Sequence, residues 1–360
     1  MLKIRISLQH KFLIKIMKRY YCCVILIVLI SLFSNCQRSP EIDKKELQQQ
    51  DSLQKVLKNS LLDSINKQLL KNPNNDSLYR ERAMIYLASK QIEVAINDCK
   101  RAIKIDSQNV KNHLALADVY FAANKTKQSK DKLEEITRKF PNNTEAYLKL
   151  GELYYLVKQY DKALENINNA LKIDATLAKS YYLKGNVYKE IGDTNKAISS
   201  LQTAVEQDPK MIDAFIDLGV IYAAKNNTLA LQYYNNALKI DPKNAIALYD
   251  KGFFFQQQGM VDSAIAVYQH ILELYPNSPQ VLYNIGAIYF AFKKNYDKSL
   301  EYFSKAIEKK PDYAEAYFAR AMVKKELKKR TDAIADLKEC LKYKTNFELA
   351  IEELNQLEKK

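Results

Sequence analysis

Apolar and polar residues alternate along most of this chain with the period of an α-helix. Between about residues 76 and 345, apolar side chains recur at i, i+3, i+4 and i+7 within each half of a longer repeating unit. This spacing places the apolar side chains on one face of a helix, so each unit is predicted to contain two amphipathic helices. Proline near the end of most units stops the second helix, because its backbone nitrogen carries no hydrogen.

Glycine positions give the length of the unit. Five of the seven glycines, Gly151, Gly185, Gly219, Gly252 and Gly286, follow one another at steps of 34, 34, 33 and 34 residues. The eight resulting units begin at Asp76, Val110, Thr144, Ala178, Ile212, Ala245, Pro279 and Ala314. The fifth unit is one residue short near 226–228 and the seventh is one residue long near 292–298, where the turn between the two helices is expected. A repeat of this length predicts a solenoid, in which each unit buries its apolar face only against its neighbours.

Residues at other equivalent positions of the units resemble those of a known repeat family. An aromatic residue lies three positions after each of the five glycines, and alanine recurs in the second half of most units. Segments such as AYLKLGELYYLVKQYDKALENINNALKID (146–174) resemble the tetratricopeptide repeat. The resemblance implies an all-α fold, a right-handed superhelical solenoid of antiparallel helix pairs, with about eight repeats over 76–345.

Helices are also expected at the two ends of the array. The apolar stripe Leu53, Val56, Leu57, Leu61, Ile65 and Leu69 predicts an N-terminal capping helix over 52–72, whose apolar face covers the first repeat. A second capping helix is expected over 346–360.

The first 35 residues have the composition of a secretory signal. An uncharged apolar run of about 14 residues at 20–33 is too short for the roughly 20 residues that span a bilayer. Only basic charges precede it, as in the leading segment of a signal peptide. Residues 1–35 are therefore predicted to be a signal peptide, and Met17 is a possible true start.

The end of this run resembles the lipobox of bacterial lipoproteins, in the looser form found in Bacteroidota. In LFSNC, Cys36 would become the acylated (palmitate-bearing) first residue of the mature chain. The resemblance implies a lipid anchor in the cell envelope, on the periplasmic side or surface of the outer membrane, with a polar tether at 36–51. An uncleaved signal anchor and a plain secretory signal with an incidental cysteine are the alternatives.

The net charge gives only weak information about the partner. The chain has 56 basic and 42 acidic residues, and removal of the six basic residues before Cys36 leaves 50 against 42, a net charge of +8. A basic surface favours anionic partners. Because an exported protein rarely meets nucleic acid, we do not expect a nucleic-acid partner.

The chain has no pattern that indicates catalysis, a metal or a cofactor. His10, His113 and His270 are far apart in sequence and lack the spacing of metal ligands. All seven glycines follow the repeat, so none forms a phosphate-binding loop. Cys99 and Cys340 fall on packing columns of the first and last units, where we expect buried, unpaired thiols. The sequence predicts a non-enzymatic scaffold without cofactors.

In tetratricopeptide arrays the first helices of successive units line a concave groove, with the second, fifth, ninth, twelfth and thirteenth residues exposed. In this chain those positions provide aromatic candidates for contacts with a protein or peptide partner, namely Phe121, Tyr155, Tyr182, Tyr249, Phe253, Tyr283 and Phe290. Alternatively, the fifth-position residues pack between adjacent helices. A clamp for a C-terminal carboxylate is not expected, because Arg80 is the one basic residue at a fifth position and Met84 occupies the ninth.

The second hypothesis is carbohydrate binding, since helical-repeat lipoproteins of nutrient-uptake systems share the anchor and the repeat. Those proteins carry inserted loops with tryptophan that stack on sugars. This chain has no tryptophan and no insertion longer than one residue, which favours the protein-binding scaffold.

Overall fold

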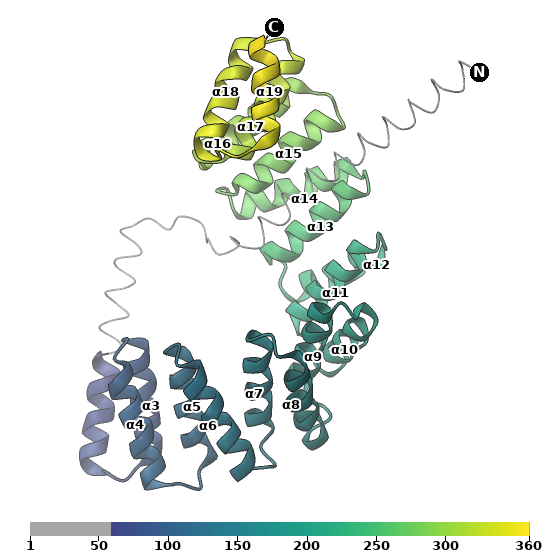
Figure 1. Cartoon of the computed structure of the whole chain (residues 1–360). Coiled ribbons are helices and arrows are strands. Elements are labelled where there is room, and N and C mark those ends of the chain that lie inside the picture. The colour runs from purple at the N-terminus through teal and green to yellow at the C-terminus, as the bar shows by residue number, and fades with distance from the viewer. Residues whose placement is uncertain (1–58, 360) are drawn as a thin grey trace. The chain divides into compact units, whose positions relative to one another are not determined.

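The structure is a computed structural model that describes residues 59–359, and all regular elements in this part of the chain are helices (Figure 1). The first helices of the eight units are α3 (Asp76–Ala88), α5 (Val110–Ala122), α7 (Thr144–Leu156), α9 (Ala178–Ile191), α11 (Ile212–Ala224), α13 (Ala245–Gln257), α15 (Pro279–Ala291) and α17 (Ala314–Glu326). The second helices are α4 (Ile92–Ile105), α6 (Thr126–Lys139), α8 (Tyr160–Ile173), α10 (Thr194–Gln207), α12 (Leu229–Ile240), α14 (Val261–Leu274), α16 (Tyr296–Lys309) and α18 (Arg330–Tyr343). Residues 59–71 are also helical, and α19 (Glu348–Lys359) ends the described chain.

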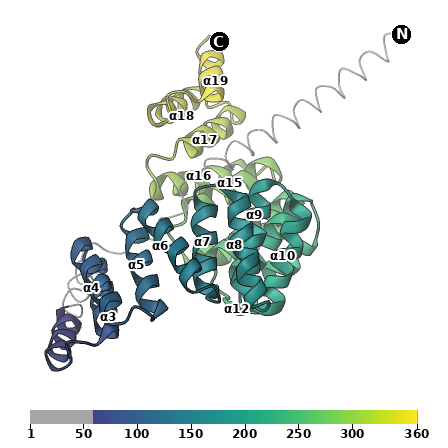
Figure 2. The same cartoon turned by 60° about the horizontal axis from the view of Figure 1, so that its bottom comes forward.

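Helices pack in chain order. Each first helix packs against the second helix of its own unit, and each second helix packs against the first helix of the next unit. First helices of adjacent units also touch at α3–α5, α7–α9, α11–α13 and α15–α17. Figures 1 and 2 agree that α7, α8, α9 and α10 lie side by side. The predicted all-α solenoid of helix pairs is confirmed.

The glycine column exists because the two helices of a unit approach closely. A Cβ atom on Gly219 would lie 2.4 Å from Cε1 of Tyr234, and one on Gly286 would lie 2.9 Å from the ring of Phe303. The second unit has Ala117 in this column and the smaller Leu133 opposite it, both in one buried cluster. The small residue therefore leaves room for the side chain that the second helix presents.

The turn between the two helices of every unit contains one residue with positive φ. These residues are Lys90, Asn124, Lys158, Gly192, Asn226, Gly259, Lys294 and Lys328. Left-handed backbone is strained for a residue with a Cβ atom, so six of the eight turns carry a conformational cost that only Gly192 and Gly259 avoid. The two slips of the repeat also fall at these turns, because α12 is shortened at its start and the turn before α16 is lengthened.

The ends of the array are covered by the extra helices. Ile65 and Leu69 of the helix at 59–71 are buried against Leu78 of the first unit. At the other end, Ala350 of α19 is buried in the same cluster as Leu337. The start of the predicted helix at 52–72 lies outside the described residues.

The first and last units each bury an arginine–aspartate pair. Arg82 donates two hydrogen bonds to Asp98, at 2.8 and 2.7 Å. Arg320 donates two to Asp336, also at 2.8 and 2.7 Å. Both carboxylates are almost fully buried, and a buried charge of this kind needs its partner. These pairs replace the leucine or isoleucine that most inner units have at the arginine position.

Cys99 and Cys340 are buried free thiols, as predicted. Burial raises the pKa of each to about 12, so both thiols are protonated at neutral pH. Within 59–359, no helix combines the length and apolar character needed to cross a membrane. The predicted signal at 1–35, Cys36 and the tether at 36–51 lie outside the described residues.

Candidate functional site

The predicted partner-contacting residues all lie on first helices or at their last turns. Phe121, at the end of α5, is the most exposed of them, with 44% of its surface accessible. The other six are half-buried and come from four helices: Tyr155, Tyr182, Tyr249, Phe253, Tyr283 and Phe290. We call the surface formed by the fifth, sixth, ninth and twelfth residues of the units the first-helix face.

Aromatic rings are concentrated on α13 and α15. The rings of Tyr249 and Phe253 are nearly parallel, with centroids 6.5 Å apart. Phe290 packs against Tyr296 at 5.9 Å. Tyr283 lies between Phe303 and Tyr313, at 5.4 and 5.5 Å, a position that also fits the alternative that fifth-position residues pack between helices.

Asp217 of α11 affects the pKa values of two of the predicted residues, Tyr182 and Tyr155. Its carboxylate accepts a hydrogen bond from Nζ of Lys189, at 2.6 Å, which forms an ion pair between α9 and α11. Burial, with the nearby Asp217 carboxylate, raises the pKa of Tyr182 to about 12. Burial also raises the pKa of Tyr155, with a smaller contribution from Asp217. Asp217 therefore lies beside Tyr182, whereas its charge acts on Tyr155 only weakly, after that of Glu190.

Asp250 of α13 is the second carboxylate of this region. Burial raises its pKa to about 7, and the like charge of Asp217 adds to the rise. The same carboxylate contributes to the raised pKa values of Tyr234 and Tyr268. Asp250 thus lies among aromatic rings and close to a second acid.

Sixth-position residues were missed by the sequence reasoning, which considered only the second, fifth, ninth, twelfth and thirteenth. Lys149, at this position of α7, binds Asp118 of α5 at 2.8 Å. Asn284, at this position of α15, donates to the hydroxyls of Tyr249 and Tyr268, at 3.1 and 3.2 Å. The repeat register could have indicated these residues, because the sixth residue of a unit follows the fifth and faces the first helix of the preceding unit.

The first-helix face is less uniformly apolar than the sequence suggested. Its N-terminal half carries ion pairs between adjacent first helices, including Lys149–Asp118 and Lys179–Glu152 at 2.8 and 2.7 Å. Arg80 is also engaged, since it donates to Asp76 and Asn112. The face therefore divides into an ionic part on α5, α7 and α9 and an aromatic part on α13 and α15.

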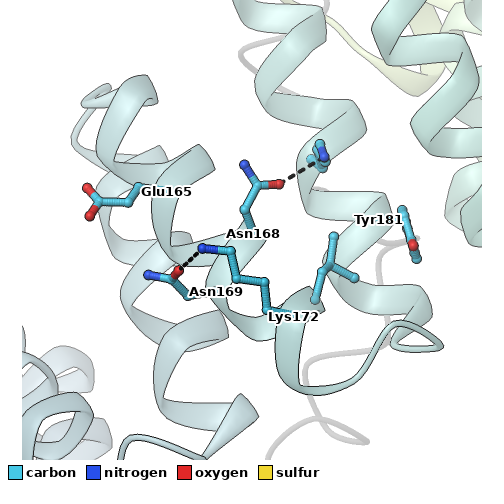
Figure 3. A pocket seen from close by; sticks show the side chains of 7 residues that line it. Glu165, Asn168, Asn169, Lys172 and Tyr181 are labelled. Atoms are coloured by element: carbon cyan, nitrogen blue, oxygen red, sulfur yellow. Dashed lines mark hydrogen bonds between the residues drawn. The ribbon is translucent and has the colours of Figure 1, made fainter.

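A hollow of about 530 Å³ lies between α8 and α9 (Figure 3), and none of the predicted partner-contacting residues lines it. Its lining includes Glu165, Asn168 and Tyr181. Nζ of Lys184 donates to Oδ1 of Asn168 at 2.9 Å, and Lys172 donates to Asn169 at 3.3 Å. The cationic groups of the hollow are thus paired with neighbouring amides.

No cluster of metal-ligating side chains occurs within the described part of the chain. His113 is buried on α5, where its Nε2 is 3.0 Å from the Ser107 carbonyl oxygen and its ring meets Phe140 edge-on. His270 is exposed on α14 beside Glu273. His10 lies outside the described residues.

Family models for tetratricopeptide repeats match residues 77–109, 114–178, 223–283, 255–314 and 314–347, and a TPR repeat model matches 185–226. Together they cover most of the chain. The chain belongs to the tetratricopeptide repeat family. Repeats of this family serve as protein-interaction scaffolds, and they are the same units that the structure shows as helix pairs.

Solved tetratricopeptide structures have the same fold. The C-terminal part of a repeat protein from Cytophaga hutchinsonii is similar over 67% of this chain and 99% of its own, with a TM-score of 0.58 and 21% identity. A repeat protein from Parabacteroides merdae matches over 69% and 99%, with a TM-score of 0.51 and 18% identity. These likenesses concern the fold alone.

Among curated proteins, the mitochondrial import receptor subunit TOM70 of Saccharomyces cerevisiae is 38% identical over 95 residues. The match covers 26% of this tetratricopeptide chain and 15% of the receptor.

Proposed function

We propose that this tetratricopeptide protein is a scaffold of the cell envelope, anchored by lipid on Cys36, which binds a segment of a partner protein on its first-helix face. The observation that carries the binding proposal is the set of aromatic side chains that remain half-buried on the first helices α7, α9, α13 and α15. Tyrosine and phenylalanine at such positions offer large contact areas with few rotatable bonds, as binding hot spots do.

Binding is tested by removing three aromatic groups that are half-buried on first helices. The triple variant Tyr155→Ser, Phe253→Ser and Phe290→Ser is expected to lose partner capture, because hot-spot side chains contribute about 2 kcal/mol each. The assay is crosslinking in the native envelope, followed by affinity purification and identification of the captured proteins. Tyr343→Ser is the matched control, since Tyr343 is an exposed aromatic residue on a second helix.

Circular dichroism must show equal helicity for the native chain, the triple variant and the control. Loss of the same captured proteins in the triple variant alone supports the proposal. Equal capture by all three proteins contradicts it.

The anchor is tested separately, because its residues precede the array. Cys36→Ser is expected to abolish incorporation of labelled palmitate and to move the protein from the membrane to the soluble envelope fraction. Several acyl chains hold a protein firmly, at about 0.8 kcal/mol per buried methylene group. Labelling of the Cys36→Ser protein at the native level would overturn the lipoprotein assignment. Labelling of intact cells with a membrane-impermeant reagent then distinguishes the surface from the periplasmic side.

A further inference from the structure

Four of the six inner units have a polar sixth residue on the first-helix face, and one of these four lacks a partner. Lys149 on α7 pairs with Asp118 on the preceding α5. Asp217 on α11 pairs with Lys189 on the preceding α9. Asn284 on α15 donates a hydrogen bond to Tyr249 on the preceding α13. At three junctions, therefore, the sixth residue meets a polar group of the previous first helix.

Asp250 occupies the same position on α13 but has no such partner. The repeat register places Val220 and Ala223 on the preceding α11, where Asp118 and Lys189 stand in the units that form ion pairs. Within 59–359, the side chain of Asp250 forms neither an ion pair nor a hydrogen bond with another residue. Asp217, which has the same sign, lies near enough to raise the pKa of Asp250.

The surroundings of Asp250 suit an organic cation. Phe253 follows three residues later, on the same side of α13, and its ring is parallel to that of Tyr249. The faces of aromatic rings attract cations, and a neighbouring carboxylate strengthens this attraction. Burial disfavours the charged form of a carboxylate and raises the pKa of Asp250 to about 7.

We infer that Asp250 recognises a lysine or arginine side chain of the partner segment, and that the aromatic rings of α13 hold the apolar part of the same segment. The inference rests on the proposed function, because it names the partner chemistry of the first-helix face. The partner segment supplies the cation that α11 does not provide. The aliphatic stem of this lysine or arginine lies along Phe253, and its charged end reaches the Asp250 carboxylate.

The test uses the detergent-purified full chain and a phage-displayed library of random 12-residue peptides. Selected peptides are expected to carry a lysine or arginine beside an aromatic or branched apolar residue. One selected peptide is then synthesised with its basic residue kept or replaced by norleucine, and both forms are titrated by fluorescence anisotropy. The norleucine peptide is expected to bind at least about tenfold more weakly to the native chain, the loss typical of a close charge pair.

The matching protein variant completes a double-mutant cycle. In Asp250→Asn the two peptides are expected to bind with equal affinity, because the neutral amide no longer distinguishes them. Asp262→Asn is the control, since Asp262 is an exposed carboxylate on α14 that pairs with Lys293, and it should keep the tenfold preference. The norleucine comparison on the native chain does not depend on folding of any variant.

The possible outcomes distinguish failure of the Asp250 assignment from failure of the proposed binding face. Selected peptides that lack basic residues, or a preference that persists in Asp250→Asn, overturn the assignment of Asp250 and leave the binding face intact. Selected peptides that bind the triple variant Tyr155→Ser, Phe253→Ser and Phe290→Ser as well as the native chain overturn the proposed binding face. Failure to select any peptide contradicts both.

Discussion

Replacing Gly219 by alanine is expected to destabilise the array, although alanine is the better helix former by about 1 kcal/mol. The added Cβ atom would lie 2.4 and 2.6 Å from Cε1 and Cδ1 of Tyr234, whereas ordinary contacts are 3.4–4 Å. The ring must therefore move by about 1 Å, and Tyr234 is only 2% exposed. Overpacking of this kind costs about 1–3 kcal/mol. After the gain of about 1 kcal/mol in helix propensity is subtracted, we expect a net loss of up to about 2 kcal/mol.

The assay is urea unfolding followed by far-ultraviolet circular dichroism, with four proteins in one cycle. They are the native chain, Gly219→Ala, Tyr234→Leu and the double variant. The double variant recreates the Ala117–Leu133 combination of the second unit. Gly219→Ala should therefore destabilise the native chain but stabilise the Tyr234→Leu background, because its methyl group fills space that the ring has left.

Gly151→Ala is the matched control. Its Cβ atom would meet Cγ1 of Ile167 at 3.0 Å, so this side chain would have to shift by only a few tenths of an ångström. We expect this change to be neutral or to stabilise by up to about 1 kcal/mol. If Gly219→Ala also stabilises, or has the same sign of effect in both backgrounds, the close approach to Tyr234 does not explain the glycine column.

Three further predictions concern the turns, the buried histidine and the terminal ion pair. In urea unfolding, Lys158→Gly is expected to raise the free energy of unfolding and Gly192→Ala to lower it, each by about 0.5–1 kcal/mol, because both residues have positive φ. An unchanged free energy of unfolding in both variants would contradict this. Burial lowers the pKa of His113 from its ordinary 6.5, so the unfolded chain takes up the proton first, and the stability present above about pH 6.5 is lost as the pH falls towards the folded pKa. His113→Gln should flatten that part of the stability profile, and an unaltered profile would exclude His113 as its source. Asp336→Asn should cost about 3 kcal/mol in urea unfolding, because Arg320 is left without its buried partner; a loss under about 1 kcal/mol would show that the pair is effectively solvated.

The fold was predictable because one signal was repeated eight times. A single unit offers only weak evidence for two helices, but the glycines at 34-residue steps fix the register for all units at once. Both slips of the repeat were assigned to the turns between helices, where the structure has them. The strained turns were missed, since lysine at Lys90 or Lys158 gives no local sign of left-handed backbone.

The candidate site was only partly predictable, because the register indicates which residues face inward but not which partners they meet. Tyr249 and Tyr283 occupy equivalent positions of adjacent units, and each packs against two rings. The rings differ, since Tyr249 meets Phe253 and Tyr268 whereas Tyr283 meets Phe303 and Tyr313. The importance of Asp217 depends on Lys189, a residue 28 positions away in the preceding unit. Such pairs depend on which two side chains meet between adjacent units. Comparing the same position across all units does not reveal them.

These junctions explain how a regular array acquires a specific site. Each unit is stabilised mainly by its neighbours, so a sixth-position residue can pair across the junction, as Lys149 and Asp217 do, or be left without a partner, as Asp250 is. A paired junction contributes to stability and offers little to a ligand, whereas an unpaired carboxylate among aromatic rings gains most when a cation arrives. In the proposed binding mode, specificity arises where the repeat leaves its own polar group without a partner, as the side chain of Asp250 is at the junction between α11 and α13.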